Sequence, residues 1–122
     1  MAEIWLPIPT VEGLEASSLG RVRVIPYPRE MPCGGQRMYG GHPWFGNIAR
    51  DVSRPRRVIR FRGKTLKVHR LVCLAFHGLP PAGRGDVLHR NGDTLQNAES
   101  NLRWATRSEV VAQTAVDAAI TI

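Results

Sequence analysis

Residues 87–110, VLHRNGDTLQNAESNLRWATRSEV, decide the fold expected for the second half of the chain. A short strand is predicted from Val87 to Arg90, and the Asn91-Gly92 pair that follows favours a turn. After irregular chain, LRWAT predicts a second strand. Thr106 and Glu109, three residues apart, form a capping box for a helix that runs to about Ala119. The order is therefore strand, loop, strand, helix.

Two polar residues of this stretch suit phosphodiester hydrolysis. That reaction needs a base that deprotonates water, an amide that holds the base in one tautomer, and a divalent cation that neutralises the leaving oxygen. His89 and Asn101 could fill the first two roles. Each also has a structural alternative, because a lone histidine is more often half-buried and bonded to backbone, and an asparagine can fasten a loop.

The preceding segment predicts a hairpin followed by a helix. In VIRFRGKTLKV, residues 58–68, apolar and cationic residues alternate, and a turn at Gly63-Lys64 would pair Phe61 with Leu66 and Arg60 with Lys67. One face of this hairpin would be apolar and the other cationic. Apolar residues then recur at helical spacing from Val68, and Gly78 with the prolines after it ends the helix at about His77.

The first part of the chain is less regular. Residues 4–24 consist of short apolar stretches broken by proline and glycine, which predicts brief strands and turns. Residues 25–57 are rich in proline and glycine and show no sustained period, so a long loop or irregular extension is expected there. The whole chain is expected to form a small mixed α+β domain with β-hairpins.

The charge of the chain favours a nucleic-acid partner. Seventeen Lys and Arg face ten Asp and Glu, for a net charge of +7, and all these cations except Lys64 and Lys67 are arginine. Arginine suits bidentate contacts to phosphate and guanine. No apolar span or basic amphipathic helix points to a membrane. Cys33 and Cys73 are too far apart for a zinc knuckle, and the absence of a signal-like start favours the cytoplasm of a bacterial or virus-infected cell.

The cations cluster between Arg50 and Arg70, where Asp51 is the single acid. A hairpin would array several of them on one face, so contact with DNA phosphates is favoured over a merely solvated surface. The residues expected to contact DNA are Arg54, Arg56, Arg57, Arg60, Arg62, Lys64, Lys67, Arg70 and Arg90.

Several spaced motifs together resemble the HNH endonucleases of the phage and homing type, whose ββα-metal fold matches the predicted order of elements. VHRLVCLAFHG (68–78) resembles the leading helix of that family, and VLHRNGD (87–93) with NAESNLRWAT (97–106) resembles its core. IWLPIP (4–9) with SLGRVRV (18–24) resembles the modular motif often placed N-terminal to such nucleases. The resemblance divides the chain into an N-terminal nuclease-associated motif with the irregular segment (1–57) and an HNH-like module (58–122) within one compact unit.

The resemblance assigns roles to residues and also raises a conflict. It implies that His89 is the general base and that Asn101 orients it. It also implies that the two metal ligands stand immediately before the base and in the first turn of the last helix, where this chain has Leu88 and Val110. Hydrocarbon side chains cannot ligate a hard divalent cation. Asp86 and Glu109 are weak substitutes, so no metal ligands are expected.

Three hypotheses remain at this point. The favoured one is an HNH-like protein that binds double-stranded DNA with lost or reduced nuclease activity and no cofactor. The second is an active nicking endonuclease that uses Mg or Mn. The third is a phage-type effector that docks on a host protein through residues 25–57.

Overall fold

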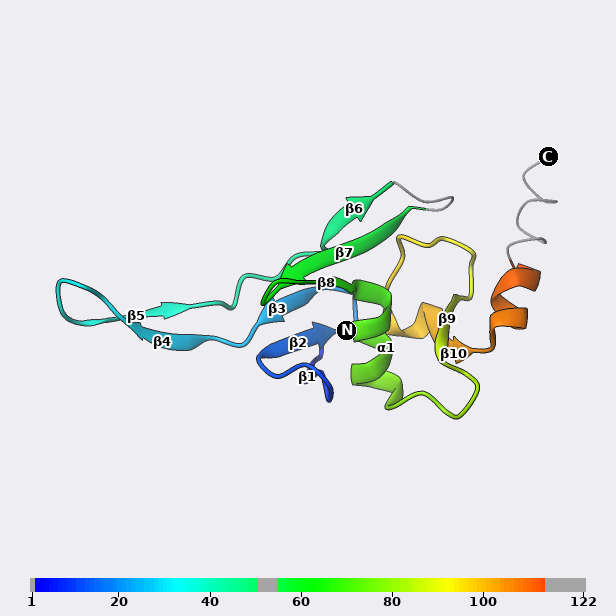
Figure 1. Cartoon of the computed structure of the whole chain (residues 1–122), viewed down its shortest axis with the longest axis horizontal. Helices are drawn as coiled ribbons and strands as arrows, with labels where there is room; N and C mark the ends of the chain where they lie inside the picture. The colour runs from blue at the N-terminus through cyan, green and yellow to red at the C-terminus, as the bar shows by residue number, and fades with distance from the viewer. Residues whose placement is uncertain (1, 51–54, 114–122) are drawn as a thin grey trace.

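The computed structural model describes residues 2–50 and 55–113. Most of its small antiparallel sheets pack around one helix, and one two-stranded sheet projects away from it (Figure 1). The N-terminal sheet has the order β1-β2-β3, and a second three-stranded sheet has the order β6-β7-β8. The element bounds are β1 Trp5–Pro7, β2 Leu14–Ser17, β3 Val22–Val24, β4 Tyr27–Glu30, β5 Gln36–Tyr39, β6 Asn47–Ala49, β7 Arg56–Phe61, β8 Lys64–Lys67, α1 Val68–His77, β9 Asp86–His89, the 3-10 turn η1 Glu99–Asn101 and β10 Leu102–Ala105. Residues 107–113 are also helical.

Helix α1 forms the centre of the hydrophobic core. Its apolar residues recur at helical spacing, and Val68, Leu71 and Val72 are buried. The other core side chains come from both halves of the chain: Leu14, Ala16 and Val22 from the N-terminal sheet, Ile59 from β7, and Leu102 and Trp104 from β10. Each fully buried aliphatic side chain contributes about 1.5–3 kcal/mol through removal of apolar surface from water. A single hydrophobic core therefore joins the N-terminal sheet to the elements of the second half of the chain.

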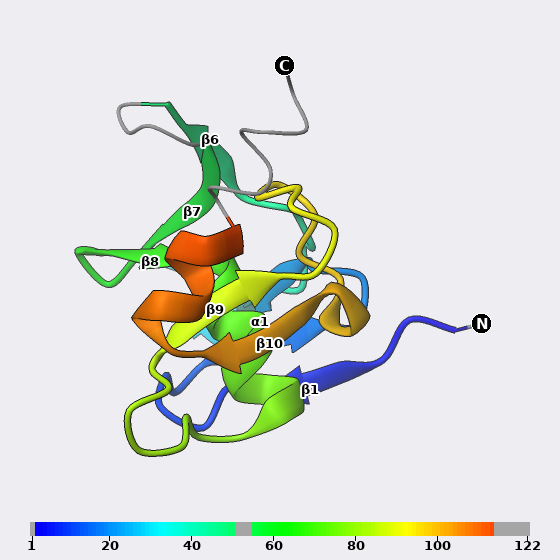
Figure 2. The same ribbon diagram turned by 90° about the vertical axis from the view of Figure 1, so that its right-hand side faces the viewer.

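The C-terminal elements follow the predicted order of strand, loop, strand and helix. Strands β9 and β10 pair antiparallel, with Leu102 opposite His89. The predicted capping box is present, since Thr106 Oγ1 accepts the Glu109 N–H at 3.2 Å and a Glu109 carboxylate oxygen lies 3.4 Å from the Thr106 nitrogen. The strand pair lies between α1 and residues 107–113 (Figure 2). The predicted end of the last helix near Ala119 falls outside the described residues.

The β7–β8 hairpin forms in a register different from the predicted one. Ile59 lies opposite Leu66 and Arg60 opposite Thr65, so the predicted pairings of Phe61 with Leu66 and Arg60 with Lys67 are wrong. The turn consists of Arg62 and Gly63 rather than Gly63-Lys64, and both turn residues have positive φ, +51° and +76°. That conformation is the one that matches the twist of a two-residue hairpin.

Residues 25–57 are more ordered than expected. In place of a long irregular loop they contain β4, β5 and β6. Strands β4 and β5 form a hairpin that projects away from the rest of the molecule, which we call the β4–β5 arm, residues 27–39 (Figure 1). Both faces of the arm are largely exposed. The alternation of apolar and polar residues that reveals a half-buried strand is therefore missing from its sequence.

Within the described residues, no helix is both long enough and apolar enough to span a membrane.

Candidate functional site

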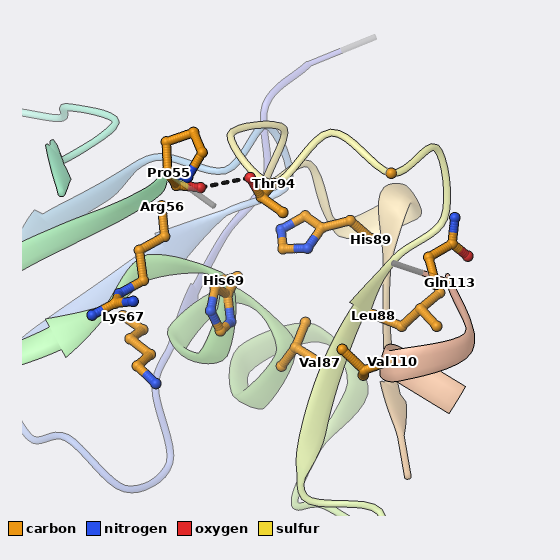
Figure 3. A pocket seen from close by; sticks show the side chains of 11 residues that line it. Pro55, Arg56, Lys67, His69, Val87, Leu88, His89, Thr94, Val110 and Gln113 are labelled. Carbon is orange, nitrogen blue, oxygen red and sulfur yellow. Dashed lines mark hydrogen bonds between the residues drawn. The ribbon is translucent and has the colours of Figure 1, made fainter. Parts of the chain in front are cut away.

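A pocket of about 200 Å³ lies where β9, the loop after it, the first turn of α1 and the last helix come together (Figure 3). We call it the His89 pocket. Its walls are formed by Pro55, Arg56, Lys67, His69, Val87, Leu88, His89, Gly92, Thr94, Val110 and Gln113. Hence His89 lies beside cations, a second histidine and several apolar side chains.

His89 is held at the end of β9 with 8% of its surface exposed. Its Nε2 atom lies 2.9 Å from Oδ1 of Asn97, a residue that is 3% exposed. With the Asn97 oxygen as acceptor, Nε2 must donate, so the lone pair of the neutral ring is on Nδ1. The loop between β9 and β10 thereby selects one tautomer of the histidine.

Asn101 fastens the same loop by other contacts. Its Oδ1 accepts the backbone N–H of Asn91 at 3.0 Å, and its Nδ2 donates to Asn91 Oδ1 at 3.0 Å and to the Gln96 carbonyl at 2.9 Å. The amide that bonds the imidazole is thus that of Asn97, whereas the Asn101 side chain bonds to Asn91 and Gln96 within the loop. This arrangement corresponds to the structural alternative for Asn101.

A second imidazole lies against the first. His69, from the first turn of α1, meets His89 edge to face with ring centroids 5.5 Å apart. Its Nδ1 atom is buried and makes no hydrogen bond to the described residues. Burial, followed by the proximity of His89, Lys67, Arg56 and Arg70, lowers the pKa of His69 to about 3. His69 is therefore neutral at neutral pH.

Two of the predicted DNA-contacting cations line the pocket. Arg56 lies at the start of β7 and Lys67 at the end of β8, and both side chains border the same cavity as His69 (Figure 3). Beside Arg56, the Thr94 hydroxyl donates to the Pro55 carbonyl at 2.5 Å and ties the β9–β10 loop to the start of β7. The pocket is therefore lined by positive charge, and a hydrogen bond holds the β9–β10 loop at its edge.

The other predicted contact residues are spread over several surfaces. Arg57 donates to the Gly46 carbonyl, and Arg70 donates to the Gly85 carbonyl while its guanidinium lies 5.3 Å from the Trp104 ring centroid. Those two arginines also brace the fold. Arg60 donates to Thr65, and Arg62 lies over Phe61. Lys64 and Arg90 are exposed, and Arg54 lies outside the described residues.

The protein side chains around the pocket do not suit a hard divalent cation. Leu88, which is 7% exposed, and Val110 both line it. Among residues 2–50 and 55–113, no group of three or more His, Cys, Asp or Glu could hold a metal ion. Magnesium and manganese need oxygen ligands, which hydrocarbon does not supply. The described donor set therefore does not fit the metal that the fold implies.

The two substitute ligands considered from the sequence have other partners. Glu109 takes part in the capping box and forms salt bridges with Arg84 and Arg103, both at 2.7 Å. The hydrogen bond from Arg103 is the main reason that the pKa of Glu109 falls to about 2. Asp86 lies opposite Ala105 at the far end of β9, 4.0 Å from Arg107. Neither carboxylate lines the His89 pocket.

Sequence reasoning missed His69 and did not identify Asn97 as the partner of His89. His69 stands beside the buried Val68 in the first turn of α1, and a polar residue next to an apolar stripe is a weak signal. Asn97 lies in the irregular chain between the two predicted strands. Its direction depends on the conformation of the whole loop, which local spacing does not determine.

Residues 66–112 match the family model described as HNH endonuclease. The chain is 35% identical over 120 residues to an uncharacterized HNH endonuclease, L247, of Acanthamoeba polyphaga mimivirus, covering 95% of this chain and 27% of that protein. A solved structure of the HNH homing endonuclease I-HmuI, described by its DNA binding and cleavage, resembles the fold with a TM-score of 0.55 and 24% identity. That similarity covers 94% of this chain and 59% of the other.

Residues 66–112 therefore resemble the HNH endonuclease family, and the three similarities together support that family for the chain. The fold is similar to that of an HNH homing endonuclease. The chain spans about a quarter of the length of its viral relative, 27%, and just over half of the homing endonuclease, 59%. Assignment of residues 4–24 to the nuclease-associated motif stays a prediction.

Proposed function

We propose that this chain is an HNH-family protein that binds double-stranded DNA and whose cleavage activity is lost or strongly reduced. The observation that carries the proposal is the composition of the His89 pocket. The pocket contains His89, whose ring is hydrogen-bonded to the Asn97 amide. Leu88 and Val110 occupy the positions where metal ligands are expected. A resident metal cofactor is therefore not part of the proposal.

The cations at the pocket support DNA as the partner. Arg56 and Lys67 border the cavity, and Lys64 and Arg90 are exposed elsewhere on the HNH module. Each such group that neutralises a phosphate releases a counterion, which gives affinity with a strong salt dependence and little sequence information. The DNA binding and cleavage described for the homing endonuclease I-HmuI agree with this partner.

Incubation of the protein with supercoiled plasmid and Mg²⁺ or Mn²⁺ tests the loss of cleavage. The proposal expects the plasmid to remain supercoiled while an electrophoretic shift shows that it is bound. The His89→Ala variant, measured in parallel, controls for a contaminating nuclease. Cleavage by the wild type that disappears in His89→Ala would refute the proposed loss of activity.

An active nicking endonuclease is the alternative, and one observation favours it. His89 is held with Nε2 as donor, which is how a histidine is prepared to accept a proton from water through Nδ1. The water oxygen would then attack phosphorus as the phosphodiester bond to the leaving oxygen breaks. Mg or Mn would have to be held by groups other than Leu88 and Val110, including the DNA phosphate itself.

A further inference from the structure

The β4–β5 arm carries its positive charge on one face only. In its register Tyr27 lies opposite Tyr39 and Arg29 opposite Arg37. Because side chains alternate between the two faces of a ribbon, these four residues share one face. The other face carries Pro28, Glu30, Gln36 and Met38. One side of the arm is thus cationic and aromatic, and the other is uncharged except for Glu30.

The two arginines are placed where they repel each other. Directly opposed like charges destabilise a strand pair. Within the described part of the chain, neither Arg29 nor Arg37 forms a salt bridge, although Arg21, Arg23, Arg84 and Arg103 each do. An isolated two-stranded hairpin is only marginally stable in water. A polyanion lying along this face would relieve the repulsion.

Tyr39 positions both guanidinium groups. Arg29 and Arg37 lie 5.5 and 5.9 Å from the centroid of the Tyr39 ring, within the range of a cation–π contact. The Tyr27 ring stacks beside it with centroids 6.1 Å apart. Guanidinium groups held over a ring lose less side-chain freedom when they bind an anion. The face is therefore preorganised for phosphate.

The base of the arm adjoins another cation. Pro26 and Tyr27 line a hollow together with Arg62 of the β7–β8 turn and with Glu12. A strand of four residues such as β4 spans roughly 13 Å, which corresponds to about four base pairs of B-DNA. The arm extends from the body on the side away from the last helix (Figure 1). It would lengthen a DNA footprint beyond the HNH module.

We propose that the β4–β5 arm is a second DNA-binding element, in which Arg29 and Arg37 contact phosphates of the backbone flanking the His89 pocket. This inference rests on the proposed DNA-binding function. It assigns the arm to nucleic acid rather than to a host protein, because its positive groups lie on one face without acidic partners. Contacts of this kind supply affinity and position.

Matched variants of the full chain test the arm. Arg37→Gln and Gln36→Glu lower the net charge equally, but the two residues point to opposite faces of the same strand. Binding to a duplex of about three helical turns is titrated with salt, where each lost phosphate contact lowers the slope by about 0.9. We expect this decrease for Arg37→Gln, about twice it for Arg29→Gln with Arg37→Gln, and clearly less for Gln36→Glu.

The exposed Cys33 at the tip of the arm gives a second readout in the unaltered protein. Cys73 is buried and does not compete for a thiol reagent. We expect a duplex of about three turns to slow modification of Cys33 several-fold, and a duplex of about one turn to slow it much less. This measurement stands even if the arginine variants lose the hairpin.

The outcomes separate the two proposals. If neither duplex binds, the proposed DNA-binding function fails, and the arm proposal fails with it. If the protein binds DNA but Arg37→Gln and Gln36→Glu have equal effects, or Cys33 reacts at an unchanged rate, the arm proposal alone is overturned. If a host protein slows the modification of Cys33 and DNA does not, the arm proposal is likewise overturned.

Discussion

The Asn97 side chain reaches across the β9–β10 loop to place its Oδ1 atom 2.9 Å from Nε2 of His89. A turn of the N-terminal sheet supports the backbone at Asn97. A Cβ atom at Gly20 would lie 2.6 Å from the Asn97 carbonyl carbon, and the Glu99 N–H donates to the Ser18 carbonyl at 3.0 Å. The position of the amide that selects the histidine tautomer thus depends on chain far away in sequence.

Asn97→Ala should destabilise the protein by about 1–3 kcal/mol, because a buried imidazole N–H loses its acceptor. It should also allow both tautomers of His89, which nitrogen NMR of the ring distinguishes. Asn101→Ala is the comparison: it removes the bonds to Asn91 and Gln96 but leaves the Asn97 contact. If Asn97→Ala keeps a single Nε2–H tautomer, the proposed role of Asn97 is wrong.

Gly20→Ala should cost about 2–4 kcal/mol in the free energy of unfolding, measured with urea. The substitution combines a positive φ of +91° with a contact that real side chains do not make. Gly35→Ala provides the control, since Gly35 has φ +80° and open space around its Cβ position. It should cost only the backbone strain, about 1–2 kcal/mol. If both variants lower the free energy of unfolding by the same amount, the β9–β10 loop moves away from Gly20 without cost.

Stability should fall in acid through His69. Its pKa is lowered from 6.5 to about 3 in the folded protein, so between these values the unfolded chain binds a proton that the folded chain does not. The free energy of unfolding therefore decreases as pH falls from 6.5 toward 3, with a limiting slope of about 1.4 kcal/mol per pH unit from this group. Urea unfolding of His69→Gln between pH 4 and about 7 should show a shallower dependence than the wild type.

His42→Gln is the matched control for that experiment. His42 is exposed, and this variant replaces a histidine in the same way while leaving His69 in place. Identical profiles for His69→Gln and the wild type would contradict the burial of a neutral His69.

Arg56→Gln and Lys67→Gln should weaken binding to duplex DNA and each lower the salt slope by nearly one. Both residues line the His89 pocket. Arg23→Gln removes the same charge from the N-terminal sheet, where Glu15 pairs with Arg23 at 2.8 Å, and should leave the slope nearly unchanged. Fluorescence anisotropy at several salt concentrations measures all three. A similar loss of slope in Arg23→Gln would mean that only net charge matters.

Leu88→Asp combined with Val110→Asn should create Mn²⁺-dependent stability. Without metal, the carboxylate at a position that is 7% exposed should lower the melting temperature. Added Mn²⁺ should raise it again by mass action, and plasmid nicking should appear. The same pair of substitutions with His89→Ala should still respond to Mn²⁺ but should not nick. If Mn²⁺ leaves the melting temperature unchanged, restoring ligands at positions 88 and 110 is not enough to rebuild a metal site.

Local patterns correctly predicted helical structure in the second half of the chain. The 3.6-residue spacing from Val68 and the capping box at Thr106 correctly located α1 and the start of the last helix. These signals involve neighbours within one or two turns, so a short stretch of chain determines them. The hairpin register failed because Arg62 adopts a positive φ, which is unusual for a residue other than glycine and shifts the turn by one position.

The contacts within the site were harder to predict because they join distant segments. Asn97 and Asn101 are only four residues apart, and the path of the loop determines which amide reaches His89. The arm was missed because neither of its faces is buried, so no hydrophobic alternation marks β4 and β5. His89 and the cations Arg56 and Lys67 could be proposed from the sequence, whereas the pairing of His69 with His89 required the fold.

The shared core has a consequence for anyone who wishes to transplant this module. One side of α1 packs against the N-terminal sheet in a single cluster that contains Leu14, Ala16, Val22, Val68, Leu71 and Val72. If residues 66–112 were excised, the apolar surface on that side of α1 would be exposed to water. The smallest fragment expected to fold on its own therefore includes the β2–β3 hairpin. A fusion to another protein should join the chain before β1 rather than between β8 and α1.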